Sequence, residues 1–520
     1  MKDLVLAIDV GTQSTRALVF DASGAQVDQA RALYDPPYHS PEPGWAELDP
    51  EVYWERVGTA CRTLWSQGRA DPGRVASACA TFQRGTVVCL DAEGAPLRAA
   101  ILWLDQRRSA RPPRLSAAWH AALAAAGASN VVARFQAEAE ANWLAEHQPH
   151  LHGRIAHYLL LSGFVTGRLT GRWRDSIACQ VGYLPFDFKR LAYAAPSDWK
   201  WKALAIAPAT LPELVAPGRP IGALTADAAR HLGLPQGLPV ISGGSDKACE
   251  VLGSGCLEPH QACIGFGTTA TFNVDSPRYV EPVRFVPAYA SARAGRFNVE
   301  YQVFRGFWMV TWFKEQFAHL ERERARELGV EPEALLEQAA TGVPAGSLGL
   351  TLQPFWTPGV AHPGPEGRGA IVGFGAHHRK PHLYRAMLEG LVYEMRSGRE
   401  RIQARTRTPV TELTLCGGGS RSDLVLQIAA DVFGLPARRA RCDEASGLGA
   451  AILGAVGAGL HPTVEAAAAA MTGPGRVFEP IPANVARYDQ LYREVYSPLY
   501  GRLQPLYRAM RRITGYPPLP

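Results

Sequence analysis

Two segments of the chain each run from an apolar strand into a Gly-Thr turn, and both have the composition of a phosphate-binding loop. The first is Asp9-Val-Gly-Thr-Gln-Ser-Thr-Arg16, and the second is Cys263-Ile-Gly-Phe-Gly-Thr-Thr-Ala-Thr271, about half a chain later. Glycine permits a tight turn, and Thr and Ser hydroxyls beside free backbone N–H groups suit phosphate oxygens. One such turn would be an ordinary hairpin. Two of them, one on each half, predict a nucleotide held between two similar domains.

The residues expected to contact the nucleotide lie in these turns and in a third, glycine-rich segment. They are Gly11, Thr12, Gln13 and Arg16 in the first turn, Gly267, Thr268 and Thr269 in the second, and Gly418 and Ser422 beside adenine or ribose. Arg16 could neutralise the transferred phosphoryl group, or it could be a surface residue of its strand. A glycine triplet such as 417–419 is also often only a tight turn.

Two carboxylates at strand ends could perform the chemistry. Asp246 follows Gly243-Gly244, where a ligand can approach the backbone, and it is our candidate general base. The alternative for Asp246 is a helix N-cap, a role that Asp favours. Asp9 could hold Mg²⁺ through water beside the first phosphate loop, or it could cap local backbone in the turn. Trp103 could stack on a sugar face, or it could belong to the core.

Strands and helices alternate along both halves of the chain and must position these residues. We expect strands over 4–10, 16–20, 27–33, 75–81, 86–90, 238–242, 297–302, 413–416 and around Gly267. We expect helices over 50–67, 115–126, 138–147, 224–232, 247–253, 310–328, 383–406, 423–433, 445–457 and 487–512. The second half repeats the pattern of the first, so the sequence predicts an α/β fold with domains 1–250 and 251–520. Stretches rich in Pro and Gly, such as 353–369, are expected to be surface loops.

The composition indicates an ordinary globular protein. The chain has 520 residues, 47% hydrophobic and 20% charged, which is enough for about two to four domains. The formal net charge of +6 is scattered rather than gathered in a basic stripe with interleaved aromatic residues, which argues against nucleic-acid binding.

Cysteine usage and the N-terminus bear on location. The nine cysteines form no Cys-x-x-Cys pair and lie mostly in apolar runs, which favours a reducing, cytoplasmic environment. The N-terminus meets an acidic residue after a short apolar run and is expected to be a strand, not a signal peptide. The apolar stretch 447–460 is too short to span a bilayer, so no membrane contact is expected.

The sequence resembles the FGGY family of carbohydrate kinases, which belongs to the actin-like ATPase superfamily. The resemblance covers nearly the whole chain and rests on segments in order, namely 9–16, Pro43-Gly-Trp-Ala-Glu-Leu-Asp-Pro50, Ile101-Leu-Trp-Leu-Asp-Gln-Arg107, 243–246, 369–389 and 417–422 with Gln427 and Asp431. It implies two actin-like (ribonuclease H-like) domains flanking a nucleotide and sugar cleft. It also implies ATP and Mg²⁺, with Asp246 as catalytic base. The residues that it implies for sugar binding are Gln83, Arg84, Trp103 and Asp246.

Some positions depart from the family pattern. Glu140 stands where Lys is usual, and Phe374 stands where a smaller aliphatic residue is usual. At Gly85, glycerol kinases carry Glu and xylulose kinases carry His, so the chain matches neither pattern fully. Losing a carboxylate removes a hydrogen-bond acceptor and opens volume, which predicts an acceptor larger than glycerol, a ketose or alditol of about four to seven carbons. Alternatively, Gly85 merely eases the turn and another side chain, from 135–147, fills the space.

The function that we expect is ATP-dependent phosphorylation of a hydroxyl on a small sugar or polyol. The alternatives are a glycerol kinase, an actin-like or chaperone-like ATPase without a sugar substrate, and a sugar sensor that lacks chemistry. The presence of Asp246 argues against the sensor. The expected partner is a small molecule. The oligomeric state, monomer or homodimer, stays open.

Overall fold

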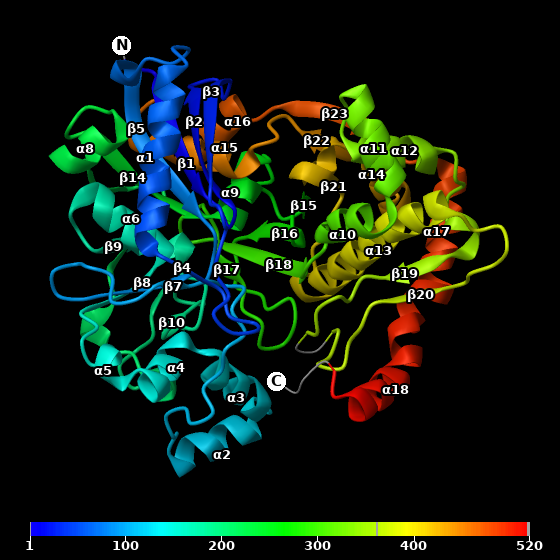
Figure 1. Cartoon of the computed structure of the whole chain (residues 1–520), viewed down its shortest axis with the longest axis horizontal. Helices are drawn as coiled ribbons and strands as arrows, with labels where there is room; N and C mark the ends of the chain where they lie inside the picture. The colour runs from blue at the N-terminus through cyan, green and yellow to red at the C-terminus, as the bar shows by residue number, and fades with distance from the viewer. Residues whose placement is uncertain (1, 360–361, 517–520) are drawn as a thin grey trace.

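Two mixed β-sheets form the centre of the molecule, one in each half of the chain (Figure 1). The computed structural model describes residues 2–359 and 362–516. The first sheet has the strand order β13-β14-β5-β1-β2-β3. The bounds of its strands are β1 Leu4–Val10, β2 Ser14–Asp21, β3 Gln26–Leu33, β5 Val75–Phe82, β13 Pro220–Ala223 and β14 Pro239–Ser245.

The second sheet has the strand order β17-β18-β16-β15-β21-β22-β23. The bounds of its strands are β15 Gln261–Phe266, β16 Ala270–Ser276, β17 Tyr289–Ala290, β18 Phe297–Val303, β21 Glu412–Cys416, β22 Ala437–Ala440 and β23 Pro474–Phe478. A smaller sheet, β4-β7-β6-β8, joins β4 Glu47–Leu48, β6 Val87–Leu90, β7 Ala100–Ile101 and β8 His157–Leu160. Short pairs are β9 Arg174–Ser176 with β12 Glu213–Val215, β10 Phe186–Asp187 with β11 Ala192–Tyr193, and β19 Thr351–Gln353 with β20 Ala370–Val372.

The two large sheets share one topology. In the first, β3, β2 and β1 form an antiparallel meander, and β5 and β14 follow in parallel on the other side of β1. In the second, β18, β16 and β15 form the meander, and β21 and β22 follow in parallel. The two Gly-Thr turns connect β1 to β2 and β15 to β16, so they occupy equivalent positions. The predicted α/β fold with two similar domains is confirmed.

Helices cover both sheets. The predicted helix at 50–67 is α1 (Pro50–Ser66), which packs on β2 and β3 and begins at Asp49, whose side chain accepts the N–H of Glu51. In the second half, α13 (Lys380–Thr406) packs on β16 and β18. The other helices are α2 Ala117–Ala125, α3 Ser129–Glu138, α4 Glu140–His147, α5 Pro149–His152, α6 Leu161–Thr170, α7 Lys200–Ala203, α8 Ala226–Leu232, α9 Asp246–Gly253, α10 Trp308–Phe317, α11 His319–Leu328, α12 Pro332–Thr341, α14 Asp423–Phe433, α15 Ala445–Gly457, α16 Val464–Met471, α17 Pro482–Leu491 and α18 Ser497–Thr514.

The small-residue helix α15 belongs to the second half of the sequence but packs on the first sheet, beside β1, β5 and β14 (Figure 1). A Cβ on Gly454 would lie 2.5 Å from Val5 Cγ1, and a Cβ on Gly449 would lie 1.9 Å from the carbonyl oxygen of Cys249 in α9. Glycine therefore lets α15 approach both the sheet and α9 closely. The division into domains 1–250 and 251–520 stays a prediction.

Some elements differ from the sequence predictions. The predicted strands at 75–81 and 86–90 exist, but β5 and β6 lie in different sheets. The predicted helix 310–328 is divided into α10 and α11 at Ala318, which has φ −113° and ψ 39°. The predicted terminal helix 487–512 consists of α17, a π-helical turn at 492–496 and α18. Residues 360–361 of the predicted loop 353–369 lie outside the described residues.

Candidate active site

The carboxyl ends of β1, β5 and β14 meet at one edge of the first sheet. Because these strands are parallel neighbours, the register places both Val10 and Ser245 beside Phe82. Asp9 and Asp246 therefore lie at the same edge, with the turn after β5 between them. Ligands of open α/β sheets bind at this kind of edge. We call it the acceptor edge.

Asp246 is the first residue of α9, directly after β14. The N-cap role considered for it belongs to Ser245, whose hydroxyl accepts the N–H of Ala248 at 3.4 Å. The Asp246 side chain is 36% exposed, so an acceptor molecule can reach it. The positive end of the α9 dipole favours a negative charge at this position.

Asp9 lies deeper in the acceptor edge and is buried. Arg16 Nη1 is 3.3 Å from Asp9 Oδ2 and 2.5 Å from Glu444 Oε2. Burial raises the pKa of Asp9 to about 6; Arg16 lowers it, and the nearby carboxylates of Asp246, Glu444 and Glu250 add to the rise. Arg16 is thus held by two carboxylates of the site.

Arg84, in the turn after β5, lies between two carboxylates from different elements. Its Nη1 donates to Glu300 Oε2 at 3.2 Å and its Nη2 donates to Glu300 Oε1 at 2.8 Å. Its Nε is 3.9 Å from Asp246 Oδ1, and the guanidinium lies over the ring of Tyr289. Burial on its own lowers the pKa of Arg84, but Glu300 and Asp246 raise it, so the guanidinium keeps its charge.

A chain of hydrogen bonds joins the first phosphate turn to the other predicted sugar-binding residues. The indole Nε1 of Trp103 donates to Thr12 Oγ1 at 3.0 Å, and Thr12 Oγ1 donates to Gln83 Oε1 at 2.9 Å. Gln83 Nε2 donates to the hydroxyl of Tyr53 at 3.2 Å. Trp103 is partly exposed. This exposure favours a role for its ring in the site over a place in the core.

Gly85 adopts φ +69°, a left-handed conformation that favours glycine. A Cβ built there would lie 3.5 Å from Trp103 Cβ and 3.7 Å from the carbonyl oxygen of Val181, which are ordinary contact distances. The turn therefore favours glycine for its backbone, and a Cβ there would be in contact with Trp103 and Val181 without a clash. Phe135, from the segment considered as a filler of this space, packs edge-on against Tyr183.

The second Gly-Thr turn and the glycine triplet lie side by side at the carboxyl edge of the second sheet, where β15 and β21 are parallel neighbours. Gly417 has φ +78°, and a Cβ there would lie 3.0 Å from the oxygen of Phe266 and 3.4 Å from the nitrogen of Gly267. Around Gly418, a Cβ would have no described atom within 4 Å. The glycine triplet and Gly267 are therefore brought together, with open space beside Gly418.

The remaining predicted nucleotide residues occupy simpler positions. Gln13 and Thr268 are exposed in their turns, and Gly11 and Thr269 are half-buried beside them. The Ser422 hydroxyl accepts the N–H of Val425 at 3.1 Å and so caps α14. Its contact with adenine or ribose stays a prediction.

Helix α9 connects the two sheets. Lys247 Nζ donates to both carboxylate oxygens of Glu250 at 3.0 Å. A Cβ on Gly265 of β15 would lie 2.0 Å from Glu250 Oε1, so glycine allows this close approach. The same helix that begins with Asp246 at the acceptor edge therefore packs against the second sheet.

Sequence reasoning missed Glu300, Glu444 and the pair of Lys247 and Glu250. Glu300 carries one weak signal, a charged residue in the middle of the predicted strand 297–302. Glu250 also lies with Cys263 and Cys416, their ligand atoms within 4.8 Å of one another, a grouping that sequence spacing does not reveal. Partners that come from distant segments leave no local motif.

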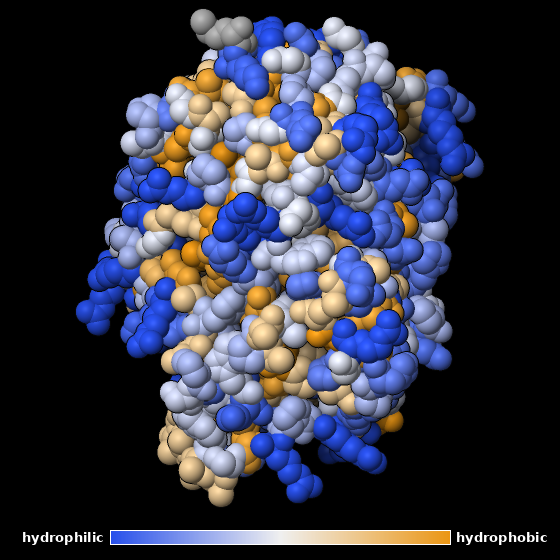
Figure 2. All heavy atoms as spheres, turned by 90° about the vertical axis from the view of Figure 1, so that its left-hand side faces the viewer, coloured by the Kyte–Doolittle hydropathy of each residue, from blue (hydrophilic) through white to orange (hydrophobic). Residues whose placement is uncertain are grey.

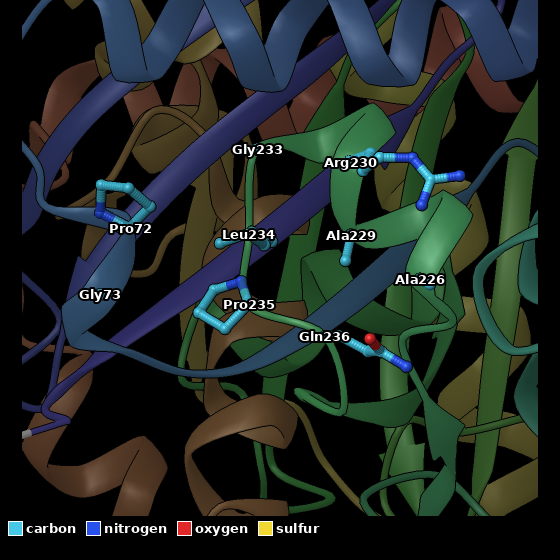
Figure 3. Close-up of a pocket in the computed structure, with 9 residues that line it drawn as sticks. All are labelled: Pro72, Gly73, Ala226, Ala229, Arg230, Gly233, Leu234, Pro235 and Gln236. Carbon is cyan, nitrogen blue, oxygen red and sulfur yellow. The ribbon is translucent and has the colours of Figure 1, made fainter.

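Other surfaces offer less chemistry. A depression of about 520 Å³ beside α8 is lined by Pro72, Leu234 and Gln236 among others (Figure 3). Its Arg230 pairs with Asp227. None of the predicted site residues lines it. Figure 2 shows hydrophilic and hydrophobic residues interspersed over the face that lies on the left of Figure 1. Within residues 2–359 and 362–516, none of the helices has the length and apolar character that a membrane crossing requires.

Known proteins resemble this chain along nearly its whole length. It is 29% identical over 509 residues to the uncharacterized sugar kinase YgcE of Escherichia coli (strain K12), covering 96% of this chain and 93% of the relative. It is 28% identical over 491 residues to a glycerol kinase of Ralstonia nicotianae (strain ATCC BAA-1114 / GMI1000), covering 92% of this chain and 94% of the relative. The crystal structure of xylulose kinase from Rhodospirillum rubrum matches with a TM-score of 0.77 at 26% identity, covering 97% of this chain and 100% of that one.

The family models agree with these likenesses. The model of the N-terminal domain of the FGGY carbohydrate kinases matches residues 4–253, and the model of the C-terminal domain matches residues 262–458. The chain therefore belongs to the FGGY family of carbohydrate kinases, and it is a phosphotransferase that uses ATP to phosphorylate a hydroxyl of a sugar or polyol.

Proposed function

We propose that the enzyme phosphorylates a ketose or alditol larger than glycerol, of about four to seven carbons, with Asp246 as the general base. The observation that carries the role of Asp246 is its position: it stands at the end of β14, accessible, while Ser245 serves as the N-cap. A carboxylate that is free of the capping role and lies beside Arg84 is available to take the proton of an acceptor hydroxyl.

Phosphoryl transfer needs positioning and charge neutralisation more than covalent help from the protein. In our proposal, Asp246 accepts the hydroxyl proton as the acceptor oxygen attacks the terminal phosphorus of ATP. Arg84 and Gln83 donate hydrogen bonds to the other hydroxyls of the acceptor, and the ring of Trp103 forms an apolar wall beside them. The two Gly-Thr turns and Arg16 bind the phosphates, while Gly418 and Ser422 border the nucleoside.

The residues at the acceptor edge fit a magnesium ion. Mg²⁺ prefers oxygen ligands and is usually bound by one or two carboxylates together with water and phosphate oxygens. Asp9 supplies a buried carboxylate beside the first turn, and the neighbouring carboxylates of Asp246 and Glu444 make the site electronegative. We propose that Asp9 holds the ion, which when bound neutralises charge on the transferred phosphoryl group.

The size of the acceptor is inferred from the glycine at position 85. A site that lacks a carboxylate here has lost an acceptor for the hydroxyls of a small triol, which favours a longer acceptor that supplies its own contacts. The φ of +69° explains the glycine in another way, as a backbone requirement. Because one relative is a glycerol kinase, glycerol is included in the test as the competing acceptor.

The deciding experiment is a coupled assay of ADP release with Mg·ATP and a panel of acceptors. We expect negligible ADP without an acceptor, and the highest kcat/KM with a ketose or alditol such as xylulose, ribulose, erythritol or a seven-carbon ketose. Glycerol as the best acceptor would contradict the proposal and restore a glycerol kinase. ADP release that no acceptor stimulates would contradict both.

The cysteines support a reducing environment, and we propose a cytoplasmic location on this basis. All nine cysteines lie within the described residues and are unpaired, and all but Cys442 are buried. Disulfides form and persist in oxidising compartments.

A further inference from the structure

Glu300, on β18, brings a carboxylate from the second sheet to the acceptor edge of the first. Its side chain is 2% exposed, and both of its oxygens accept hydrogen bonds from Arg84, at 2.8 and 3.2 Å. A two-point pair of this kind fixes the plane of the guanidinium as well as its position. Glu300 therefore determines how Arg84 is oriented.

Arg84 has a second carboxylate within reach. Its Nε is 3.9 Å from Asp246 Oδ1, which is too long for a hydrogen bond. The guanidinium offers five N–H donors, and Glu300 uses two of them, one on each terminal nitrogen. Of the remaining donors, the Nε–H lies nearest to Asp246.

Removing the charge of Glu300 would leave Asp246 as the main carboxylate that attracts Arg84. Arg84 is 16% exposed and would keep its positive charge, because a guanidinium does not lose its proton in proteins. Asp246 is the other carboxylate that the described structure places beside it. The attraction would then draw Arg84 into a closer ion pair with Asp246.

We propose that Glu300 is a positioning residue that holds Arg84 away from a tight ion pair with Asp246, so that Arg84 can bind the acceptor and Asp246 can take its proton. The inference rests on the proposed role of Asp246 as general base. It also means that the acceptor site is complete only when the two sheets are close, because Arg84 and Glu300 come from different sheets.

Other charged and titratable groups face this pair. Lys247 on α9, Asp9 on β1 and the Cys249 thiol face Asp246, and Tyr289 on β17 faces Arg84. Substituting Glu300 leaves all of them in place. The two changes expected from a displaced Arg84 are a higher KM for the acceptor and a lower kcat.

The test is Glu300→Gln, which keeps the size of the side chain and removes its charge. We expect the KM for the acceptor to rise about tenfold while the KM for ATP stays within about twofold, because a hydrogen-bonded charge that orients Arg84 is lost. We expect kcat to fall about tenfold, because an Asp246 drawn into a closer ion pair with Arg84 is less able to take the proton of the acceptor hydroxyl. Glu300→Asp should restore part of both effects.

The matched control is Asp275→Asn on the neighbouring strand β16. Asp275 is also buried and also pairs with arginines, Arg293 at 3.0 Å and Arg296 at 2.5 Å, but it lies outside the acceptor edge. We expect Asp275→Asn to lower stability while leaving kcat and the acceptor KM unchanged. In an Arg84→Ala background, Glu300→Gln should have no further effect on either quantity.

Three results would overturn the inference. They are a folded Glu300→Gln enzyme with the wild-type kcat and acceptor KM, the same changes in Asp275→Asn, or an undiminished effect of Glu300→Gln when Arg84 is alanine. If Glu300→Gln does not fold, Glu300→Asp is judged by the same two quantities. Failure of the proposed function is distinct: wild-type enzyme would then show no acceptor-dependent ADP release, or Asp246→Asn would keep full turnover.

Discussion

The indole N–H of Trp103 donates a hydrogen bond to the hydroxyl of Thr12, 91 residues earlier in the chain. The same hydroxyl donates to Gln83. Thr12 belongs to the turn predicted to bind phosphate, whereas Trp103 and Gln83 are predicted to bind the acceptor. One small side chain thus connects the groups that are predicted to hold the two substrates.

This connection can be tested with Thr12→Val. The valine keeps the shape of the side chain but leaves Trp103 Nε1 and Gln83 Oε1 without their partner, which costs about 1–3 kcal/mol for a buried polar group. We expect kcat/KM for the acceptor to fall at least about tenfold. Steady-state kinetics with the best acceptor provides the measurement. Thr12→Ser retains the hydroxyl and should stay near wild type; equal losses in both variants would argue against the hydrogen bonds.

Asp246→Asn tests the general base. We expect kcat to fall by about 10²–10⁴-fold, because the amide cannot accept the hydroxyl proton, while the affinity for an ATP analogue is retained. Turnover and calorimetric binding give the two quantities. The control is Asp227→Asn, which changes an exposed aspartate in the first turn of α8. Near-normal turnover in folded Asp246→Asn would exclude the assignment.

Glu140 makes stability depend on pH. Burial raises its pKa from 4.5 to about 8, with Asp105 and Glu138 adding to the rise, and its Oε2 has no described hydrogen-bond partner. Between pH 4.5 and about pH 8, the Glu140 carboxyl is ionised in the unfolded chain and protonated in the folded chain. The unfolded state therefore binds fewer protons, and stability falls as pH rises, by about 1.4 kcal/mol per pH unit.

Glu140→Gln should remove this dependence, because an amide does not titrate. We expect its Tm to exceed that of the wild type at about pH 8, and the advantage to shrink at about pH 5. Thermal unfolding at the two pH values measures it. Glu55→Gln on the exposed face of α1 serves as the control and should show no such difference. An equal Tm change for Glu140→Gln at both values would contradict the protonated state.

Substrate binding should bring the two sheets closer. The phosphate turns lie on different sheets, and both are proposed to contact one nucleotide, so saturating ligands favour the closed arrangement and exclude water. Small-angle scattering with an ATP analogue and the best acceptor should give a smaller radius of gyration than the free enzyme. The analogue alone is the comparison. A radius that the full set of ligands leaves unchanged would argue against closure.

Most of the strands, turns and helices could be predicted from the sequence, because each is specified by residues close together in the chain. The Gly-Thr turns follow strands whose apolar runs are unmistakable, and Asp49 caps α1 through its own side chain. By contrast, α6 was missed because nearly all of its residues are buried, from Leu161 to Thr170, and a helix buried all round has no amphipathic period. Local patterns report local structure.

The site was predictable only in part. Asp9 and Asp246 could be proposed because each lies at the end of a strand that is visible in the sequence, and Gln83 because of the family resemblance. The partners that orient them could not: Glu300 meets Arg84 across 216 residues, and Glu444 meets Arg16 across 428. Which carboxylate an arginine meets depends on the packing of two sheets against one helix, and no spacing along the chain encodes it. The nine cysteines likewise gave no metal-ligand spacing, although two of them lie beside Glu250 in space.

The placement of α15 and α16 has a consequence for how the protein could be divided. The backbone leaves the first sheet and its helices after α9, returns to them after β22 and leaves them again after α16. Between α15 and α16, His461 Nε2 bonds the carbonyl oxygen of Ala22. A fragment cut once, near residue 250, would strip the first sheet of a helical cover and expose Leu18 and Val5 to water. Because a segment from the second half of the sequence packs on the first sheet, neither half of the chain is expected to fold on its own. Two co-expressed halves, by contrast, could reassemble.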